Sequence, residues 1–147
     1  DVVQLFDSWA GAVAASEFDH WVINPTAEIV KRVKAVHPKV PIIGFANKAG
    51  LMYDPYVQKT GIDGVSIDSS VPVSWAASTL QGQCAVQGNL DPQLLVAGGA
   101  GLMHEAETIL ETLGQGPFVF NLGHGIVPET PPEHVAQLAD FIRGWSR

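Results

Sequence analysis

The stretch FVFNLGHGIVPETPPEHV, residues 118–135, decides the fold class, because it joins a short apolar strand pattern to the start of a helix. Similar apolar runs, each followed by helical material, occur earlier as VVQLF (2–6), VPIIGFA (40–46), GVSID (64–68) and CAVQGNL (84–90). Runs rich in Val, Ile and Phe without clean polar alternation are typical of buried parallel strands, with both sheet faces covered, and the segments between them are long enough for crossover helices. The pattern therefore predicts five β-α units built on a parallel sheet.

The helices carry recognisable start signals. In NPTAEIVKRVKAVHP (24–38), Asn24 can cap the helix, a proline occupies the first turn and another proline closes the segment. In the closing helix, Thr130 is the predicted N-cap, Pro131 the first helical residue and Glu133 the reciprocal partner of a capping box.

The segment between the fourth and fifth strands is less regular. The glycines of AGGAG (97–101) predict a loop, whereas residues 103–113 predict a helix that ends at Gly114. No linker, low-complexity tract or short repeat interrupts the chain, which indicates one domain or part of one.

Five β-α units fit either an open doubly wound sheet or part of a (β/α)8 barrel. The Gly-rich G-x-G-x-x-G turn of a nucleotide-binding sheet is absent after the first strand. Polar or small residues instead follow every strand, as expected where the strand ends of a barrel build a site: FDSWAG (6–11), FANKAG (45–50), IDSS (67–70), GNLDP (88–92) and NLGHG (121–125). A complete barrel has eight strands and about 250 residues, so this chain, which begins without Met, is expected to be a piece of one.

Composition excludes several classes of partner. The net charge is −7 and no basic run with interleaved aromatic residues occurs, which argues against nucleic-acid binding. No apolar stretch reaches the roughly 18 to 20 residues of a membrane span, and no secretion signal opens the chain. The single cysteine, Cys84, cannot form an internal disulfide, which fits a cytoplasmic location.

Two residues stand out as candidates for chemistry. His124 follows the last strand between Gly123 and Gly125, which are expected to let the backbone turn sharply and leave the ring at the mouth of the barrel. Ser8 ends the first strand, where its hydroxyl can donate to or accept from a ligand. No G-x-S-x-G elbow accompanies them, so a Ser/His nucleophile pair is disfavoured.

Other strand-end residues have competing interpretations. Asp68 can be a site carboxylate, a cap or an orienting group, and Asp91 before Pro92 is better explained as a helix N-cap. Lys48 can meet an anionic substrate, although a solvated loop lysine is the simpler interpretation. Cys84 is expected to be a small buried hydrophobe, and no cluster with metal-ligand spacing predicts a zinc site. The other histidines are expected on helix surfaces: His20, His37, His104 and His134. The tryptophans are expected to pack in the core or between helices and sheet: Trp9, Trp21, Trp75 and Trp145. Trp9 is also near enough to Ser8 to lie at the mouth of the barrel.

Three motifs in the same order, QLFDSWAG (4–11), QGNLDP (87–92) and FNLGHGIVPETPPEHV (120–135), resemble the C-terminal half of uroporphyrinogen decarboxylases across the whole chain. The resemblance implies that residues 1–147 are the C-terminal part of a single TIM-barrel domain whose N-terminal part is missing. It implies a cofactor-free lyase of haem and tetrapyrrole biosynthesis, a homodimer in the family, that converts the four acetate side chains of uroporphyrinogen to methyl groups, giving coproporphyrinogen. This fragment alone would be inactive.

By the same resemblance, the active-site serine of the family corresponds to Ser8 and its histidine to His124. The family's aspartate that gathers the pyrrole N–H groups, its arginine motif and its tyrosine have no counterpart here, so the missing half of the barrel is the expected partner. Two alternatives remain. One is a corrinoid-dependent zinc methyltransferase of the same superfamily, disfavoured because FANKAG and NLGHG lack cysteine. The other is a non-catalytic half-barrel that assembles with another chain through its unpaired edges.

Overall fold

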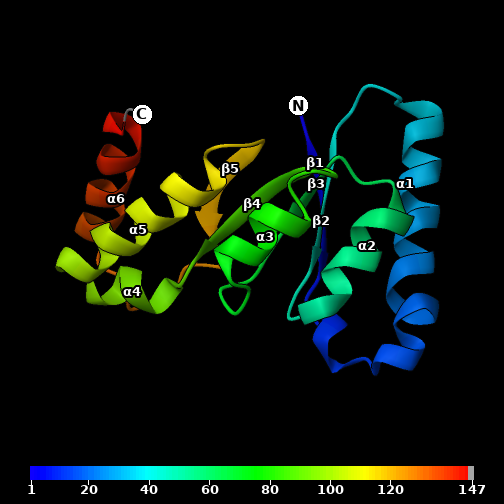
Figure 1. The fold of residues 1–147 in the computed structure, drawn as a ribbon, viewed down its shortest axis with the longest axis horizontal. Helices are drawn as coiled ribbons and strands as arrows, with labels where there is room; N and C mark the ends of the chain where they lie inside the picture. Colours follow the sequence, from blue (N-terminus) through cyan, green and yellow to red (C-terminus); the bar gives the residue numbers. More distant parts are fainter. Residues whose placement is uncertain (146–147) are drawn as a thin grey trace.

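Five parallel strands form one sheet in the computed structural model, which describes residues 1–145, and their spatial order follows the chain, β1-β2-β3-β4-β5 (Figure 1). The strands are β1 (Val3–Asp7), β2 (Ile42–Ala46), β3 (Gly64–Ser66), β4 (Ala85–Leu90) and β5 (Phe118–Leu122). The prediction of five parallel strands, part of a (β/α)8 barrel, is confirmed.

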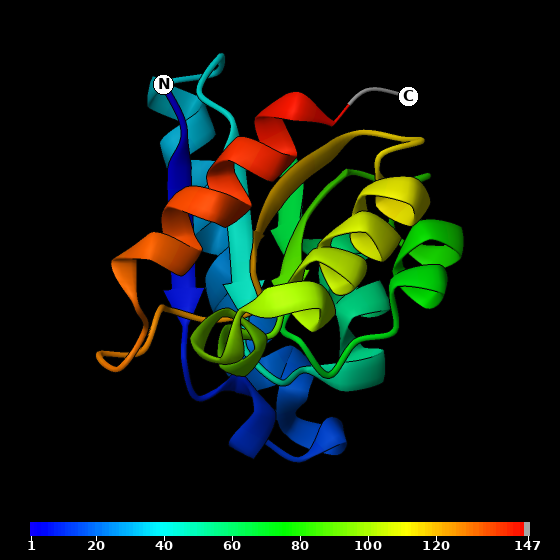
Figure 2. The ribbon, with the colours of Figure 1, turned by 90° about the vertical axis from the view of Figure 1, so that its left-hand side faces the viewer.

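Helices connect successive strands and pack beside the sheet. They are α1 (Asn24–Val36), α2 (Tyr53–Thr60), α3 (Val73–Thr79), α4 (Pro92–Ala97), α5 (Gly99–Leu113) and α6 (Pro132–Gly144). Short helical turns add η1 (Ala10–Ala12), η2 (Ala15–Glu17), η3 (Asp19–Ile23) and η4 (Gly50–Met52). Figure 1 shows α1 and α2 at the β1 end of the sheet, and Figure 2 shows α5 and α6 side by side at the other end. Within residues 1–145, none of the helices combines the length and apolar composition that a membrane crossing requires.

The sheet is strongly curved. Gln4 of β1 and Gln87 of β4 are three strands apart, which corresponds to about 14 Å in a flat sheet. Nevertheless, the Gln87 side-chain amide donates a hydrogen bond to the Gln4 side-chain oxygen at 3.2 Å. These two side chains can meet only on the concave face of a sheet that curls toward closure, as the strands of a barrel do.

The two faces of the sheet differ in polarity. Val65 pairs with Val86 and both join the apolar core, together with residues of the flanking helices. The next pair in register, Ser66 and Gln87, points to the concave face, where the Gln87 amide also donates to the Ser66 hydroxyl at 3.2 Å. The concave face is the interior of a partial barrel, and it carries polar side chains that the apolar strand patterns did not predict.

The closing helix begins later than the sequence suggested. Its N-cap residue is Pro131, with an extended ψ of 128°, and no side chain caps it. Because a residue before proline is disfavoured in the helical region, Pro132 forces Pro131 out of the helix. The predicted capping box of Thr130 and Glu133 is wrong, and the buried Thr130 hydroxyl has no hydrogen-bond partner among residues 1–145.

Two further helix starts differ from prediction. Asn24 is not a cap, because the π-helical turn η3 runs directly into α1 and buries Val22 and Ile23. The predicted loop at 97–101 is a break of one residue, since Gly98 (φ 67°) separates α4 from α5.

The burial of three aromatic residues differs from prediction. His134 is half-buried rather than on the surface: its Nδ1 lies 2.9 Å from the Leu95 carbonyl oxygen, and its ring leaves no room for a side chain at Gly98. Trp9 and Trp21 are 80% and 63% exposed, so the packing role predicted for them is wrong.

Candidate functional site

Ser8 and His124 line one cavity at the carboxyl ends of the strands. The cavity has a volume of about 480 Å³ and is bordered by the loops after β1, β2 and β5. Both side chains are exposed in the described chain, and Trp9 lies beside them. The structure thus brings together the two residues that the sequence singled out, although 115 residues of chain (9–123) separate them.

A second cavity of about 340 Å³ continues from the first along the concave face, and His124 borders both. Its lining includes Gln4, Ser66 and Asn121 from β1, β3 and the end of β5, together with Phe45. The His124 and Phe45 rings meet edge to face, with centroids 6.4 Å apart. The second cavity also has apolar lining from Phe6, Leu122 and Ile126, and the imidazole stands between it and the cavity that holds Ser8.

The loops after β1 and β2 are locked together by backbone contacts. Asn47 donates its N–H to the Asp7 carbonyl at 3.0 Å, and Gly11 donates its N–H to the Asn47 carbonyl at 2.9 Å. Gly11 must be glycine at this crossing, because an added Cβ would lie 2.7 Å from the Lys48 carbonyl oxygen. Ser8 is therefore fixed relative to Lys48 by two interlocked loops.

The loop after β2 also passes through an unusual backbone conformation. Lys48 has φ 60°, in the left-handed region that a residue with a Cβ adopts at an energetic cost. Its N–H donates to the Asp68 carboxylate at 2.9 Å. Lys48 is exposed, as a solvated loop lysine would be, and it also borders the cavity with Ser8 and His124.

Asp68 acts as a buried hub beneath this loop. It is 5% exposed and accepts hydrogen bonds from the Lys48 N–H, the Tyr53 hydroxyl at 2.9 Å, and both the N–H and the hydroxyl of Ser70. Burial alone would raise the pKa of the Asp68 carboxyl, but the hydrogen bonds from Ser70, Tyr53 and Lys48 outweigh burial and lower that pKa below its ordinary value. Asp68 therefore orients neighbouring groups as an ionised carboxylate and does not face the cavity that holds Ser8.

The glycines around His124 lie where the chain bends, as predicted. Neither Gly123 nor Gly125 has a positive φ, so the bend does not depend on the left-handed region. Gly123 donates its N–H to the Leu90 carbonyl at 2.8 Å and packs so closely on the backbone of Ser69 that a Cβ would collide with it. Gly125 faces open space. The loop of His124 is thus pinned against the loop that follows β3.

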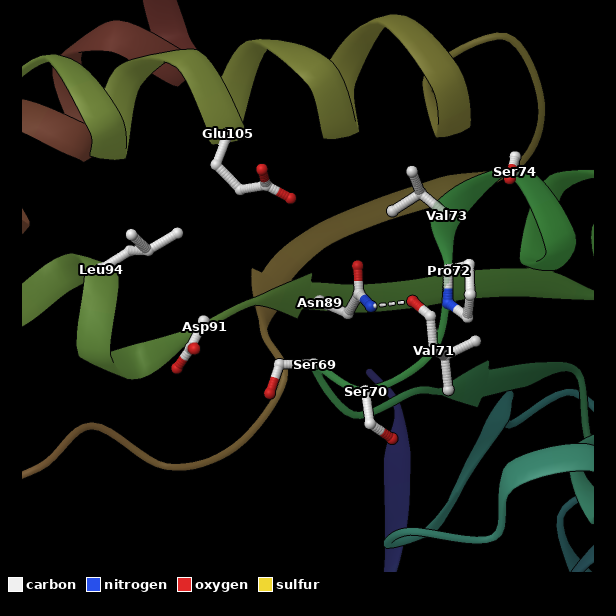
Figure 3. A pocket seen from close by; sticks show the side chains of 10 residues that line it. All are labelled: Ser69, Ser70, Val71, Pro72, Val73, Ser74, Asn89, Asp91, Leu94 and Glu105. Atoms are coloured by element: carbon white, nitrogen blue, oxygen red, sulfur yellow. Dashed lines mark hydrogen bonds between the residues drawn. The ribbon is translucent and has the colours of Figure 1, made fainter.

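A separate cavity of about 320 Å³ lies between the end of β4, α5 and the loop after β3 (Figure 3). Asp91 borders it and accepts the Gln93 N–H at 2.9 Å, which confirms Asp91 as the N-cap of α4. Asn89 donates to the Asp68 and Val71 carbonyls at 3.0 and 2.8 Å, tying β4 to the loop after β3. This role of Asn89 was not predicted, although the residue lies in the strand end GNLDP.

The remaining candidate ligands are dispersed. Among residues 1–145, no group of three or more His, Cys, Asp or Glu side chains is arranged to hold a metal ion. Cys84 is buried, as predicted, and burial raises the pKa of its thiol to about 11. Cys84 therefore packs as a small hydrophobe and is not placed to act as a thiolate.

Comparisons with known proteins agree on one family. The family described as Uroporphyrinogen decarboxylase (URO-D) matches residues 1–145. The uroporphyrinogen decarboxylase of Rhodospirillum rubrum is 52% identical over 143 residues, covering 97% of this chain and 41% of that protein. The uroporphyrinogen decarboxylase of Mesorhizobium japonicum is 54% identical over 147 residues, covering all of this chain and 43% of that protein.

A solved structure shares the fold at low sequence identity. A methyltransferase from Methanosarcina mazei superposes with a TM-score of 0.75 and 16% identity, covering 96% of this chain and 41% of that chain. This likeness concerns the fold alone. The chain spans roughly two fifths of the length of the relatives it matches, 41% and 43% in the two cases above. With the family match over nearly every residue, the chain belongs to the uroporphyrinogen decarboxylase family.

Proposed function

We propose that this chain is the C-terminal part of a uroporphyrinogen decarboxylase domain, which converts the four acetate side chains of uroporphyrinogen to methyl groups and releases carbon dioxide. The observation that carries the proposal is the cavity shared by Ser8 and His124, at the strand ends of a chain that belongs to this family. In a parallel barrel, loops at the carboxyl ends of the strands bind substrate.

Ser8 and His124 have complementary roles in this proposal. The serine hydroxyl donates a hydrogen bond to a substrate carboxylate or accepts one from a pyrrole N–H. The imidazole binds a propionate or acetate carboxylate, or passes a proton to the reacting pyrrole. Gln4, Ser66 and Asn121 line the second cavity among apolar side chains and offer further hydrogen-bonding groups to a large substrate.

The proposed chemistry needs only protons and the substrate's own ring. A proton adds to a pyrrole carbon and makes the ring an electron sink. The bond between the acetate methylene and its carboxylate then breaks, the electron pair moves into the ring, and carbon dioxide leaves. A second proton adds to the methylene carbon while the ring proton departs, so each acetate consumes one proton net and becomes a methyl group. The protein binds, orients and stabilises charge.

The proposed function also requires residues from the N-terminal part of the barrel. Uroporphyrinogen carries eight carboxylates, whereas this chain has a net charge of −7, so cationic groups from an N-terminal part of the barrel are needed. The same resemblance supports a homodimer, and the unpaired buried Cys84 fits a cytoplasmic location. The loops after β2 and β5 contain no cysteine, the thiolate ligand of the methyltransferase alternative, which favours the decarboxylase.

The test is a decarboxylation assay on the full-length protein that contains this chain. Uroporphyrinogen is supplied in its reduced form, and the products are oxidised and separated by chromatography according to their number of carboxylates. We expect His124→Ala to lower kcat/KM by about 10²-fold or more, because removing a positioned proton-transfer group costs about 10²–10⁴-fold. We expect Ser8→Ala to lower kcat/KM by about tenfold, because it removes one hydrogen bond to a charged substrate group. The matched controls, His104→Ala and Ser78→Ala, change exposed residues on α5 and α3 and should retain activity. A wild-type protein that forms no coproporphyrinogen, or a fully active His124→Ala variant, would refute the proposal.

A further inference from the structure

Some Lys and Arg side chains of the chain form ion pairs with carboxylates, and others do not. Four of the eight Lys and Arg residues form ion pairs on the helices: Arg32 with Glu28, Lys34 with Asp63, Lys59 with Asp19 and Arg143 with Asp140. The Lys48 ammonium makes no ion pair or hydrogen bond with any residue in the range 1–145, and Lys48 borders the cavity that holds Ser8 and His124. Within the described residues, Lys48 therefore brings an ammonium that is not paired with a carboxylate to the mouth of the candidate site.

The backbone at this position is held in a costly conformation. A glycine adopts φ 60° freely, whereas lysine does not, yet lysine stands here. The Asp68 carboxylate fixes the Lys48 N–H, and the closely packed Gly11 fixes its carbonyl side. Strained residues that their surroundings hold in place occur frequently at binding sites, where the strain fixes the direction of a functional group. This arrangement is expected if the Lys48 side chain binds a ligand and does not serve only to form the turn.

We infer that Lys48 is a substrate-binding residue that pairs with a carboxylate of the tetrapyrrole in the cavity shared with Ser8 and His124. This inference rests on the proposed function and extends it to a residue outside the serine and histidine of the family resemblance. An ammonium and a carboxylate form a charge-assisted hydrogen bond, which is stronger than a neutral one. Lys48 thus supplies locally part of the positive charge that the acidic chain otherwise lacks.

The test compares Lys48→Met with Lys39→Met in the full-length protein. Lys39 is also exposed and unpaired within the described residues, but it precedes β2 and lies at the opposite end of the strands from the cavity. The two variants therefore change net charge equally. We expect Lys48→Met to raise the KM for uroporphyrinogen about tenfold, which corresponds to about 1.4 kcal/mol of lost binding, with a smaller effect on kcat. Lys39→Met should leave KM within twofold of the wild type, and Lys48→Arg should preserve most of the affinity.

A glycine variant separates binding from backbone strain. Lys48→Gly removes the charge and relieves the left-handed conformation, so we expect a raised KM together with a melting temperature equal to or above that of the wild type. Loss of affinity through misfolding would lower both activity and melting temperature. Fluorescence titration with uroporphyrin, the oxidised octacarboxylate, should show the same order of affinities as KM.

The outcomes distinguish this inference from the proposed function. If the wild type decarboxylates uroporphyrinogen and Lys48→Met has an unchanged KM and unchanged uroporphyrin affinity, the role of Lys48 is refuted and the proposed function stands. If the wild type binds uroporphyrin but does not decarboxylate uroporphyrinogen, the proposed reaction is refuted, and the uroporphyrin affinity of Lys48→Met still decides the role of Lys48. A wild type that neither binds nor reacts refutes both.

Discussion

Replacing Asp68 by asparagine tests the buried hub beneath the candidate site. Each carboxylate oxygen accepts two donors: one oxygen serves the Lys48 N–H and the Tyr53 hydroxyl, and the other serves the N–H and hydroxyl of Ser70. Whichever way an asparagine amide is turned, its NH₂ group faces one of these pairs. A hydroxyl can rotate to accept, but a backbone N–H cannot, so one backbone donor loses its acceptor.

The loss in the free energy of unfolding can be estimated from these hydrogen bonds. An unsatisfied buried donor costs about 1–3 kcal/mol, and the bonds that survive lose the strengthening of a charged acceptor, roughly 1 kcal/mol more. We therefore expect Asp68→Asn to lower the free energy of unfolding by about 3 kcal/mol. Asp91→Asn is the matched control: it makes the same chemical change at an N-cap that accepts one hydrogen bond, and asparagine caps as well as aspartate, so we expect less than about 0.5 kcal/mol.

The assay is urea unfolding of the full-length protein and both variants at pH 7, 5 and 3. The pKa of Asp68 is lowered in the folded chain from an ordinary value of 3.8, so its ionised form stabilises the fold. That contribution is fully present above the unfolded pKa and is lost as the pH falls through the lower folded pKa. The deficit of Asp68→Asn should therefore be equal at pH 7 and 5 and smaller at pH 3. Equal stabilities of Asp68→Asn and Asp91→Asn at pH 7 would show that the hub does not hold the loop as described.

Three further predictions concern packing. Gly123→Ala should lower the free energy of unfolding in urea by about 2 kcal/mol, because the added Cβ collides with neighbouring backbone. Gly125→Ala, in open space, should change it by less than about 0.5 kcal/mol. Similar values for both variants would contradict the close approach of Gly123 to Ser69. The Cys84 thiol, buried and with its pKa raised to about 11, should react with a thiol reagent at pH 8 slowly in the native protein and rapidly in urea, followed by mass spectrometry of its peptide; rapid native labelling would contradict its burial. Thr130→Val should be neutral or stabilising, because the buried hydroxyl has no partner in the described part of the chain. A true N-cap would lose about 1–2 kcal/mol in the same unfolding experiment.

The strands could be predicted because each is a compact apolar run between segments of different periodicity. VPIIGFA and CAVQGNL correspond to β2 and β4 within two residues at each end, and FVFNL matches β5 at both ends. The helix starts were less predictable, because consecutive prolines moved the start of α6 by one residue. The polarity of the concave face was missed, because Gln4 and Gln87 meet only through the curvature of the sheet.

The site was predictable only in part. Residues at strand ends, such as Ser8 and His124, are visible in the sequence because every parallel strand delivers its loop to the same edge. The support beneath them is not visible, since it depends on contacts between loops that are distant in the chain, such as Gly11 with Asn47 and Lys48 with Asp68. The exposure of Lys48 on the cavity emerges only from these contacts.

The order of the strands in the sheet affects how this part of the protein folds during synthesis. Each strand pairs with the one before it, so no strand must be inserted between two that already exist. Every pairing joins strands that are neighbours in the chain, so the loops to be closed are shorter than in a sheet that pairs distant strands. During translation, each β-α unit can therefore be added to a growing sheet as it leaves the ribosome, with the newest edge always open to the next strand.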